Sequence, residues 1–257
     1  MGSYCQLYIC DYPVYESKSS VFPLVMSMFR ESDKRVYDRY VKDRNHIQWD
    51  EIDSKDDERE VAIEYRALAK HARDRLEISG FNLSRVIREF SEAKSTEIEK
   101  LTKWAEDDDH DLWSETINLL KSTDFADYLE AFHIILNSGT HPSYYVDENP
   151  DSSELIHFIL EHNTHFYWGF PCLDFRCFLR TLLEIAPDES YVIQDVTDLV
   201  HAGLYDAADS VCHLALDELI GDYQTSAKII VLTEGITDTE ILRGTLDLLY
   251  PHLSDLR

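Results

Sequence analysis

Two long amphipathic patterns in the first half of the chain constrain its fold most strongly. Between residues 60 and 78 the apolar residues recur every three or four positions, which predicts a helix with one apolar face. A second pattern of the same kind runs over residues 83–106. Only Gly80, Phe81 and Asn82 separate the two patterns, and a glycine there ends a helix readily. We therefore expect two long helices that lie side by side and antiparallel.

Shorter segments with helical patterns follow along the chain. We expect helices over residues 34–44, 112–121, 123–137, 153–161, 172–185, 195–202 and 206–219. Residues 4–10 have the aromatic and aliphatic composition of a strand, which needs a partner, and residues 229–232 are one candidate. The expected fold class is mainly α with a small β component, an α+β arrangement.

The composition limits the classes of partner. The 257 residues carry 50 Asp and Glu against 24 Lys and Arg, a net charge of −26 that repels nucleic acid and anionic membranes unless basic residues cluster locally. The same charge suits a basic protein partner. No run of 18 apolar residues and no signal peptide is present, so we expect a cytoplasmic chain. Five cysteines without a C-x-x-C pair indicate reduced, mostly buried thiols.

Near the end of the chain a buried strand, a tight turn and an amphipathic helix are expected over residues 227–242. Glu234 follows the strand, and Asp238 lies four residues later in the first turn of the helix. Two carboxylates in this arrangement can share a divalent cation such as Mg²⁺, which prefers oxygen ligands. Alternatively, Asp238 interacts only with the helix N-terminus and Glu234 is a solvated turn residue.

A basic stripe is expected on the helix over residues 34–44. Arg35, Arg39 and Lys42 follow i, i+4, i+7 spacing and would share one helix face, which favours contact with nucleic-acid phosphates. The alternative is a solvated helix face.

Residues 231–238, Val-Leu-Thr-Glu-Gly-Ile-Thr-Asp, resemble the opening motif of Toprim domains. The resemblance implies that Glu234 belongs to a metal-dependent phosphodiester-cleaving site, and that Asp238 joins it as in the OLD-type branch. The preceding region resembles the HEPN/Toprim-associated N-terminal domain of bacterial conflict proteins, which act in antiviral defence. The segments that carry this resemblance include Pro23-Leu24-Val25-Met26, Gly169-Phe170-Pro171-Cys172 and Asp198-Leu199-Val200-His201-Ala202-Gly203.

The resemblance implies two parts, a helical domain over residues 1–222 and the start of a Toprim-like domain over residues 223–257. Toprim domains carry a D-x-D pair on a later strand, and no such pair follows Asp238. We therefore expect an incomplete site, which would bind Mg²⁺ and cleave nucleic acid only when the Toprim part is completed. By itself the chain would bind a protein partner or form a homo-oligomer.

Two other functions remain open. HEPN ribonucleases resemble one another in an Arg-x4–6-His motif, which Arg39 and His46 match with six residues between them. That resemblance implies metal-independent RNA cleavage, with His46 as acid and base and Arg39 stabilising the transition state. The remaining alternative is a non-catalytic acidic protein that occupies a nucleic-acid-binding surface as a mimic.

Overall fold

The computed structural model describes residues 3–45, 47, 58–107, 113–139, 153–162, 167–222 and 235–256. Its strands are β1 (Tyr4–Ile9), β2 (Tyr12–Lys18), β3 (Lys34–Tyr40), β4 (Arg59–Leu68) and β5 (Tyr191–Asp195). Its α-helices are α1 (Pro23–Met26), α3 (Ala69–Ile78), α4 (Leu83–Asp107), α5 (Ser114–Ser122), α6 (Phe125–Leu136), α8 (Glu154–Glu161), α9 (Phe175–Ile185), α10 (Thr197–His201), α11 (Val211–Asp222) and α12 (Ile236–Leu249). The described residues also form the 3₁₀ helices η1 (Glu31–Asp33), η2 (Val41–Asp43) and η4 (Pro251–Leu256). Helices predominate over one five-stranded antiparallel sheet, so the predicted α+β class is confirmed.

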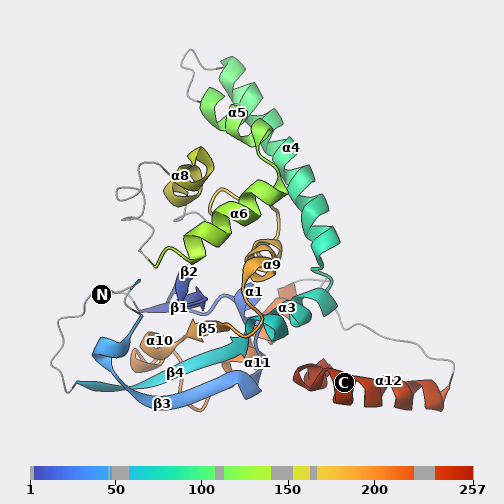
Figure 1. Cartoon of the computed structure of the whole chain (residues 1–257). Helices are drawn as coiled ribbons and strands as arrows, with labels where there is room; N and C mark the ends of the chain where they lie inside the picture. Colours follow the sequence, from blue (N-terminus) through green and yellow to red (C-terminus); the bar gives the residue numbers. More distant parts are fainter. Residues whose placement is uncertain are drawn as a thin grey trace.

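The sheet has the strand order β2-β1-β5-β4-β3, and each neighbouring pair is antiparallel. β5 lies in the centre between β1 and β4, although it is last in the sequence (Figure 1). Both sides of β1 are therefore occupied, by β2 and by β5. The partner of β1 on the second side is β5; residues 229–232, the suggested partner, lie outside the described part of the chain.

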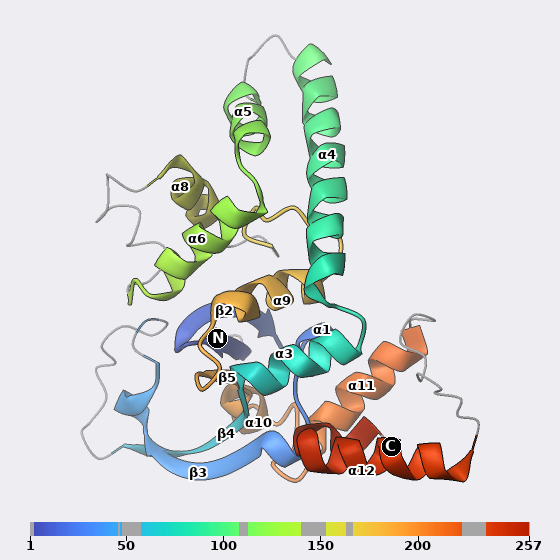
Figure 2. The ribbon, with the colours of Figure 1, turned by 45° about the vertical axis from the view of Figure 1, so that its right-hand side comes forward.

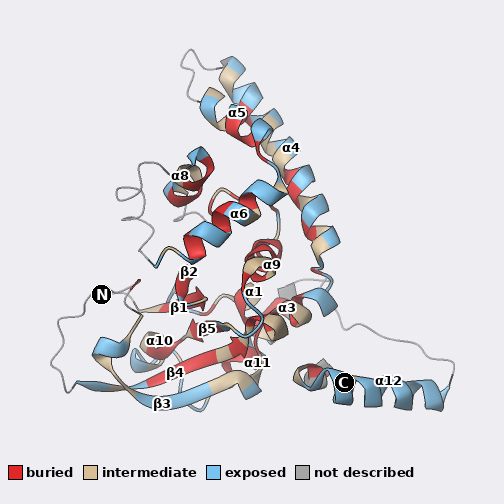
Figure 3. Ribbon diagram, in the orientation of Figure 1, coloured by how far each residue is buried: buried red, intermediate tan, exposed pale blue. Residues whose placement is uncertain are grey.

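One face of the sheet packs against the helices. Cys5, Leu7 and Ile9 of β1 share this core with Ile63 and Tyr65 of β4, and all five are at most 1% exposed. Helices α1, α3, α6 and α9 lie on this side (Figure 1), and the buried residues concentrate where they meet the sheet (Figure 3). Helix α9 is the centre of this layer, since every residue from Phe175 to Leu183 is buried.

The predicted helix over residues 60–78 was wrong in its first half. Strand β4 occupies Arg59–Leu68, and helix α3 begins only at Ala69. Spacing of four residues fits one face of a strand as well as one face of a helix, because both 2 and 3.6 nearly divide it. The β-branched and aromatic residues Val61, Ile63 and Tyr65 recur at every second position, alternating with Glu60, Ala62 and Glu64, and this period of two is the strand pattern.

The predicted helix over residues 34–44 was also wrong. Those residues form strand β3 and then the short 3₁₀ helix η2. β3 pairs with β4 along its whole length, from Lys34 opposite Tyr65 to Tyr40 opposite Arg59. The backbone hydrogen bonds to β4 stabilise this segment as a strand. Its own charged sequence does not indicate a strand.

The helices predicted between residues 83 and 185 are confirmed with small changes at their ends. Helix α4 begins at Leu83 as expected, and Asp124 and Ser153 cap α6 and α8 through side-chain hydrogen bonds. At the far end of the chain, α12 lies on the opposite side of the molecule from α5 in both views (Figure 1 and Figure 2). Within the described residues, no helix is long and apolar enough to cross a membrane.

Candidate functional site

The face of the sheet opposite the core is polar. One row of paired residues crosses all five strands on this face, and it consists of Glu16, Gln6, Asp195, Glu64 and Arg35. Gln6 Nε2 donates to Glu16 Oε2 at 3.1 Å within this row. Because side chains alternate between the faces of a strand, Glu60 of β4 and Arg39 of β3 lie on the same face.

Arg39 is the centre of this polar face. Its Nε donates to Glu60 Oε1 at 2.7 Å, and its Nη1 donates to Glu64 Oε1 at 3.0 Å and to Asp195 Oδ2 at 2.9 Å. The Arg39 side chain is only 9% exposed. One guanidinium therefore neutralises carboxylates from two different strands, β4 and β5.

Two further arginines extend this network. Arg44 Nη2 donates to Glu60 Oε2 at 2.5 Å and to Asp198 Oδ1 at 3.0 Å, and Arg66 Nη2 donates to Glu64 Oε2 at 3.0 Å. We refer to these seven side chains as the arginine–carboxylate cluster: Arg39, Arg44, Arg66, Glu60, Glu64, Asp195 and Asp198. Three positive charges face four negative ones, so the cluster is close to neutral.

Two members of the cluster, Glu60 and Arg39, stay ionised at neutral pH. Burial raises the pKa of Glu60, but hydrogen bonds from Arg44 and Arg39 outweigh it and hold this pKa below its ordinary value. Burial likewise opposes the charge on Arg39, and the carboxylates of Asp195 and Glu60 outweigh it and raise the pKa of the guanidinium. Neither group is therefore a proton donor or acceptor at neutral pH.

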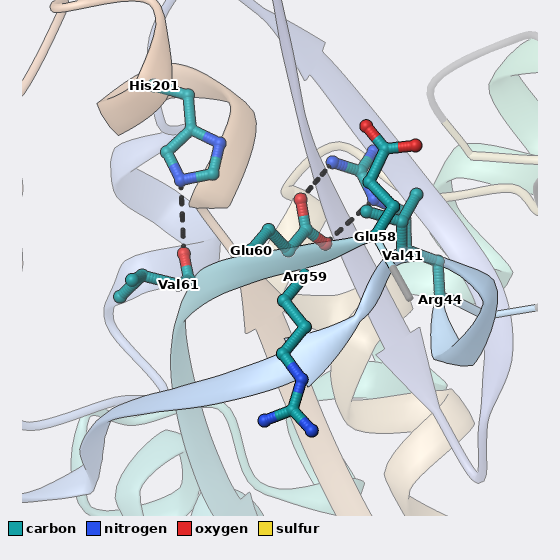
Figure 4. Close-up of a pocket in the computed structure, with 7 residues that line it drawn as sticks. All are labelled: Val41, Arg44, Glu58, Arg59, Glu60, Val61 and His201. Atoms are coloured by element: carbon teal, nitrogen blue, oxygen red, sulfur yellow. Dashed lines mark hydrogen bonds and ion pairs between the residues drawn. The ribbon is translucent and has the colours of Figure 1, made fainter. Parts of the chain in front are cut away.

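An open groove of about 770 Å³ lies beside the cluster, between η2, β4 and α10 (Figure 4). It is lined by Val41, Arg44, Glu58, Arg59, Glu60, Val61 and His201. The ring of His201 is fixed by its Nε2, which lies 3.1 Å from the carbonyl oxygen of Val61. The guanidinium of Arg59 lies 4.4 Å from the ring centre of Tyr40, a cation–π contact. Among the described residues, no group of three or more His, Cys, Asp and Glu side chains could hold a metal ion.

The expected basic stripe does not form as a helix face. The side chain of Arg39 is mostly enclosed by the cluster, whereas Arg35 and Lys42 are exposed. Arg35 Nη1 donates to the carbonyl oxygens of Ser32 and Lys34, and Lys42 Nζ lies 5.5 Å from the ring centre of Tyr40. The expectation failed because these residues belong to a strand and a 3₁₀ helix, so i, i+4, i+7 spacing does not align them.

The other predicted site residues are placed only in part. His46, the proposed partner of Arg39, and Glu234, the first proposed metal ligand, lie outside the described residues. Asp238 is exposed in the first turn of α12. The structure therefore does not test whether Arg39 lies near His46, or whether Glu234 lies near Asp238.

Sequence reasoning missed Arg44, Glu60 and Glu64 as parts of a shared site. One signal could have found the two glutamates. They lie four residues apart on one face of β4, and the apolar residues Val61, Ile63 and Tyr65 alternate with that face, which is the pattern of a strand with one polar face.

Residues 1–224 match the family model described as HEPN/Toprim N-terminal domain 1. No curated protein and no solved structure matches the chain. The family match covers all five strands and every helix up to α11. The chain therefore belongs to the HEPN/Toprim N-terminal domain 1 family.

Proposed function

We propose that this chain is the N-terminal module of a Toprim-type nuclease of bacterial antiviral defence, in which it binds a protein partner or holds an assembly together. Metal-dependent cleavage of nucleic acid would then require a completed Toprim domain. The observation that carries the proposal is the exposed apolar surface of α12, the helix that follows the family-matched residues.

Helix α12 exposes apolar side chains along its length. Ile241 and Leu248 are 62% and 80% exposed, and Leu242 and Leu249 are 40% and 61% exposed. Each pair is spaced by seven residues, so the four side chains form one stripe on the helix. A contiguous apolar stripe on a surface is typical of an interaction site, because its burial removes apolar area from water. We infer that another chain or domain covers this stripe.

The residues present fit one part of a magnesium site. Asp238 offers an exposed carboxylate in the first turn of α12, and a hydrated Mg²⁺ is commonly held by one or two such groups together with a phosphate. Glu234 would supply the second carboxylate, and the completed domain would supply the rest. When bound, the ion would stabilise the charge that develops on a phosphodiester during cleavage.

The arginine–carboxylate cluster favours a structural role for Arg39 over a catalytic one. A phosphate that approached Arg39 would have to displace Glu60, Glu64 or Asp195 and would meet their negative charges. For the ribonuclease alternative, the guanidinium should instead face an open surface. The net charge of −26 also disfavours nucleic acid and suits a basic protein partner.

The test compares residues 1–257 with a longer chain translated from the same reading frame. We expect no cleavage of DNA or RNA by residues 1–257 with Mg²⁺, and Mg²⁺-dependent cleavage by the longer chain. E234Q in the longer chain should abolish cleavage, whereas E240Q, which changes an exposed acid of α12, should preserve it. Full activity of the longer E234Q variant, or a frame that encodes no later acidic pair, would refute the Toprim assignment.

A further inference from the structure

The C-terminal segment, which comprises α12 and η4, contacts the helical body (helices α3, α4, α6 and α9) through two stacked histidines. The rings of His71 in α3 and His252 in η4 lie with their centres 4.0 Å apart and their planes 12° from parallel. His252 Nε2 lies 2.9 Å from Asp74 Oδ2. Arg75 Nη2 donates to the carbonyl oxygen of His252 at 3.4 Å. Helix α3 therefore contacts both the imidazole ring and the backbone carbonyl of His252.

Within the described residues, this contact between η4 and α3 is what attaches α12 to the rest of the fold. Every α12 residue apart from Leu246 is exposed, so the helix itself buries little surface. Just after it, His252 has a side chain that is 12% exposed, and Leu253 is 1% exposed. The position of α12 therefore depends on a few side chains of η4, with His252 making the polar contacts.

Charged groups surround the histidine pair on several elements. Lys70, Asp74 and Arg75 face it from α3, and Asp33 faces it from η1. Asp74 and Asp33 favour a positive charge on His252, whereas Arg75 disfavours it. A positive charge on His71 is disfavoured by the ring of His252, by Arg75 and by Lys70. Asp74 favours it. The ring of Tyr250 lies 6.2 Å from the ring of His252 and adds no charge.

The lowered pKa values of the two histidines predict how docking of η4 depends on pH. Burial lowers the pKa of His71, and repulsion by His252 and Arg75 lowers it further. Burial also lowers the pKa of His252, despite the hydrogen bond to Asp74. Because the docked state binds protons more weakly than the released state, docking is strongest above the ordinary histidine pKa of 6.5 and weakens as the pH falls below it.

We propose that the stacked His71–His252 pair is a proton-operated latch, which holds η4 and α12 on the helical body while both rings are neutral and releases them when both are charged. Two neutral imidazoles stack favourably, whereas two imidazolium ions at this separation repel each other beside the fixed charge of Arg75. The two-state element is the α3–η4 contact, and its release frees α12 for another surface.

The test measures the distance between α12 and the helical body in the whole chain as a function of pH. Spin labels are placed at the exposed positions Thr245 in α12 and Glu99 in α4, through T245C and E99C in a C10S background. From about pH 7.5 to about pH 5, we expect one narrow distance population to be replaced by a broad one, with the change below the ordinary histidine pKa. Circular dichroism at each pH verifies that the fold is intact.

Three variants distinguish release caused by the two histidines from a general effect of acid on the fold. H71F/H252Q keeps a ring at one position and a hydrogen-bonding amide for Asp74 at the other, and it should stay docked over the whole range. H252A should be released even at the higher pH. H213A, which changes an exposed histidine of α11, should behave as the parent chain does. An unchanged parent distribution, a docked H252A, or an H71F/H252Q variant that opens like the parent would each overturn the proposal.

Discussion

Arg39 Nη1 and Asp195 Oδ2 lie 2.9 Å apart, although 156 residues separate them in the sequence. This contact joins the edge strand β3 to the central strand β5 across β4. Since Glu60 and Glu64 of β4 bind the same guanidinium, one side chain connects three adjacent strands on their polar face. The cluster thereby compensates for the charge that the sheet carries on the face away from its core.

Loss of Arg39 should destabilise the fold strongly. R39A leaves Glu60, Glu64 and Asp195 with mostly buried carboxylates that lack their shared cation. Removal of one partner from a buried ion pair costs about 3–5 kcal/mol of unfolding free energy. Urea unfolding measures the loss. The matched variant R35A removes an exposed arginine from the same strand and should change stability by less than about 0.5 kcal/mol. Equal stabilities for R39A and R35A would contradict a structural role.

The cluster also predicts how stability depends on pH. The pKa of Glu60 is below its ordinary value of 4.5 in the folded chain. Its charged form therefore stabilises the fold above that value, and this contribution is lost as the pH falls through the lower, folded pKa. We expect the difference in unfolding free energy between the parent chain and E60Q to shrink below about pH 4.5.

The measurement is urea unfolding of the parent chain and E60Q at several pH values between neutral and acid. E99Q, which changes an exposed carboxylate of α4, serves as the matched control and should differ little from the parent chain throughout. A gap between the parent chain and E60Q that stays constant down to the lowest pH would argue against an ionised Glu60 as the stabilising group.

Helix predictions succeeded where local pattern and tertiary structure agree. The apolar stripe of α4 and the caps Asp124 and Ser153 are local signals, and the structure has these helices where they were expected. The prediction over residues 60–78 failed because its apolar spacing fits both a strand and a helix. Only the partners β3 and β5 decide between them, and they are distant in the sequence.

The site was harder to predict than the helices. Arg39 was identified from its spacing to His46 and its charge, but its actual partners come from β4 and β5. β5 itself was missed, because Tyr191–Asp195 is a short segment next to a predicted helix. Residues that meet only through a sheet register leave no local pattern, so the carboxylates around Arg39 required the structure.

Gly169 should tolerate alanine less well than Gly203. Both have positive φ angles, of +70° and +73°, where a side chain is unfavourable. A Cβ at position 169 would lie 2.5 Å from Cε1 of Phe158, whereas a Cβ at position 203 would meet nothing within 4 Å. We expect G169A to lose about 1–3 kcal/mol more than G203A, since the close contact adds to the backbone cost. Thermal unfolding compares the two variants, and equal losses would disprove the close packing of residue 169 on α8.

Four of the five thiols should be unreactive in the folded chain. Burial raises the pKa of Cys5 to about 11, and it also raises the pKa of Cys172, Cys177 and Cys212. The thiolate is the reactive form, so iodoacetamide near pH 8 should add at most one label, at the half-buried Cys10. Intact mass spectrometry counts the labels, and a denatured sample should take five. Rapid native labelling of Cys177 or Cys212 would contradict the packing of α9 or α11.

The most direct test of the central claim is an RNA cleavage assay of residues 1–257 in EDTA. If Arg39 is a structural residue and the chain is an assembly module, the parent chain should leave single-stranded and structured RNA intact, and H46A should give the same result. Radiolabelled RNA on a sequencing gel detects low levels of cleavage. Cleavage in EDTA that is lost in H46A, while the H46A chain keeps its folded circular dichroism spectrum, would contradict the account and establish a metal-independent ribonuclease.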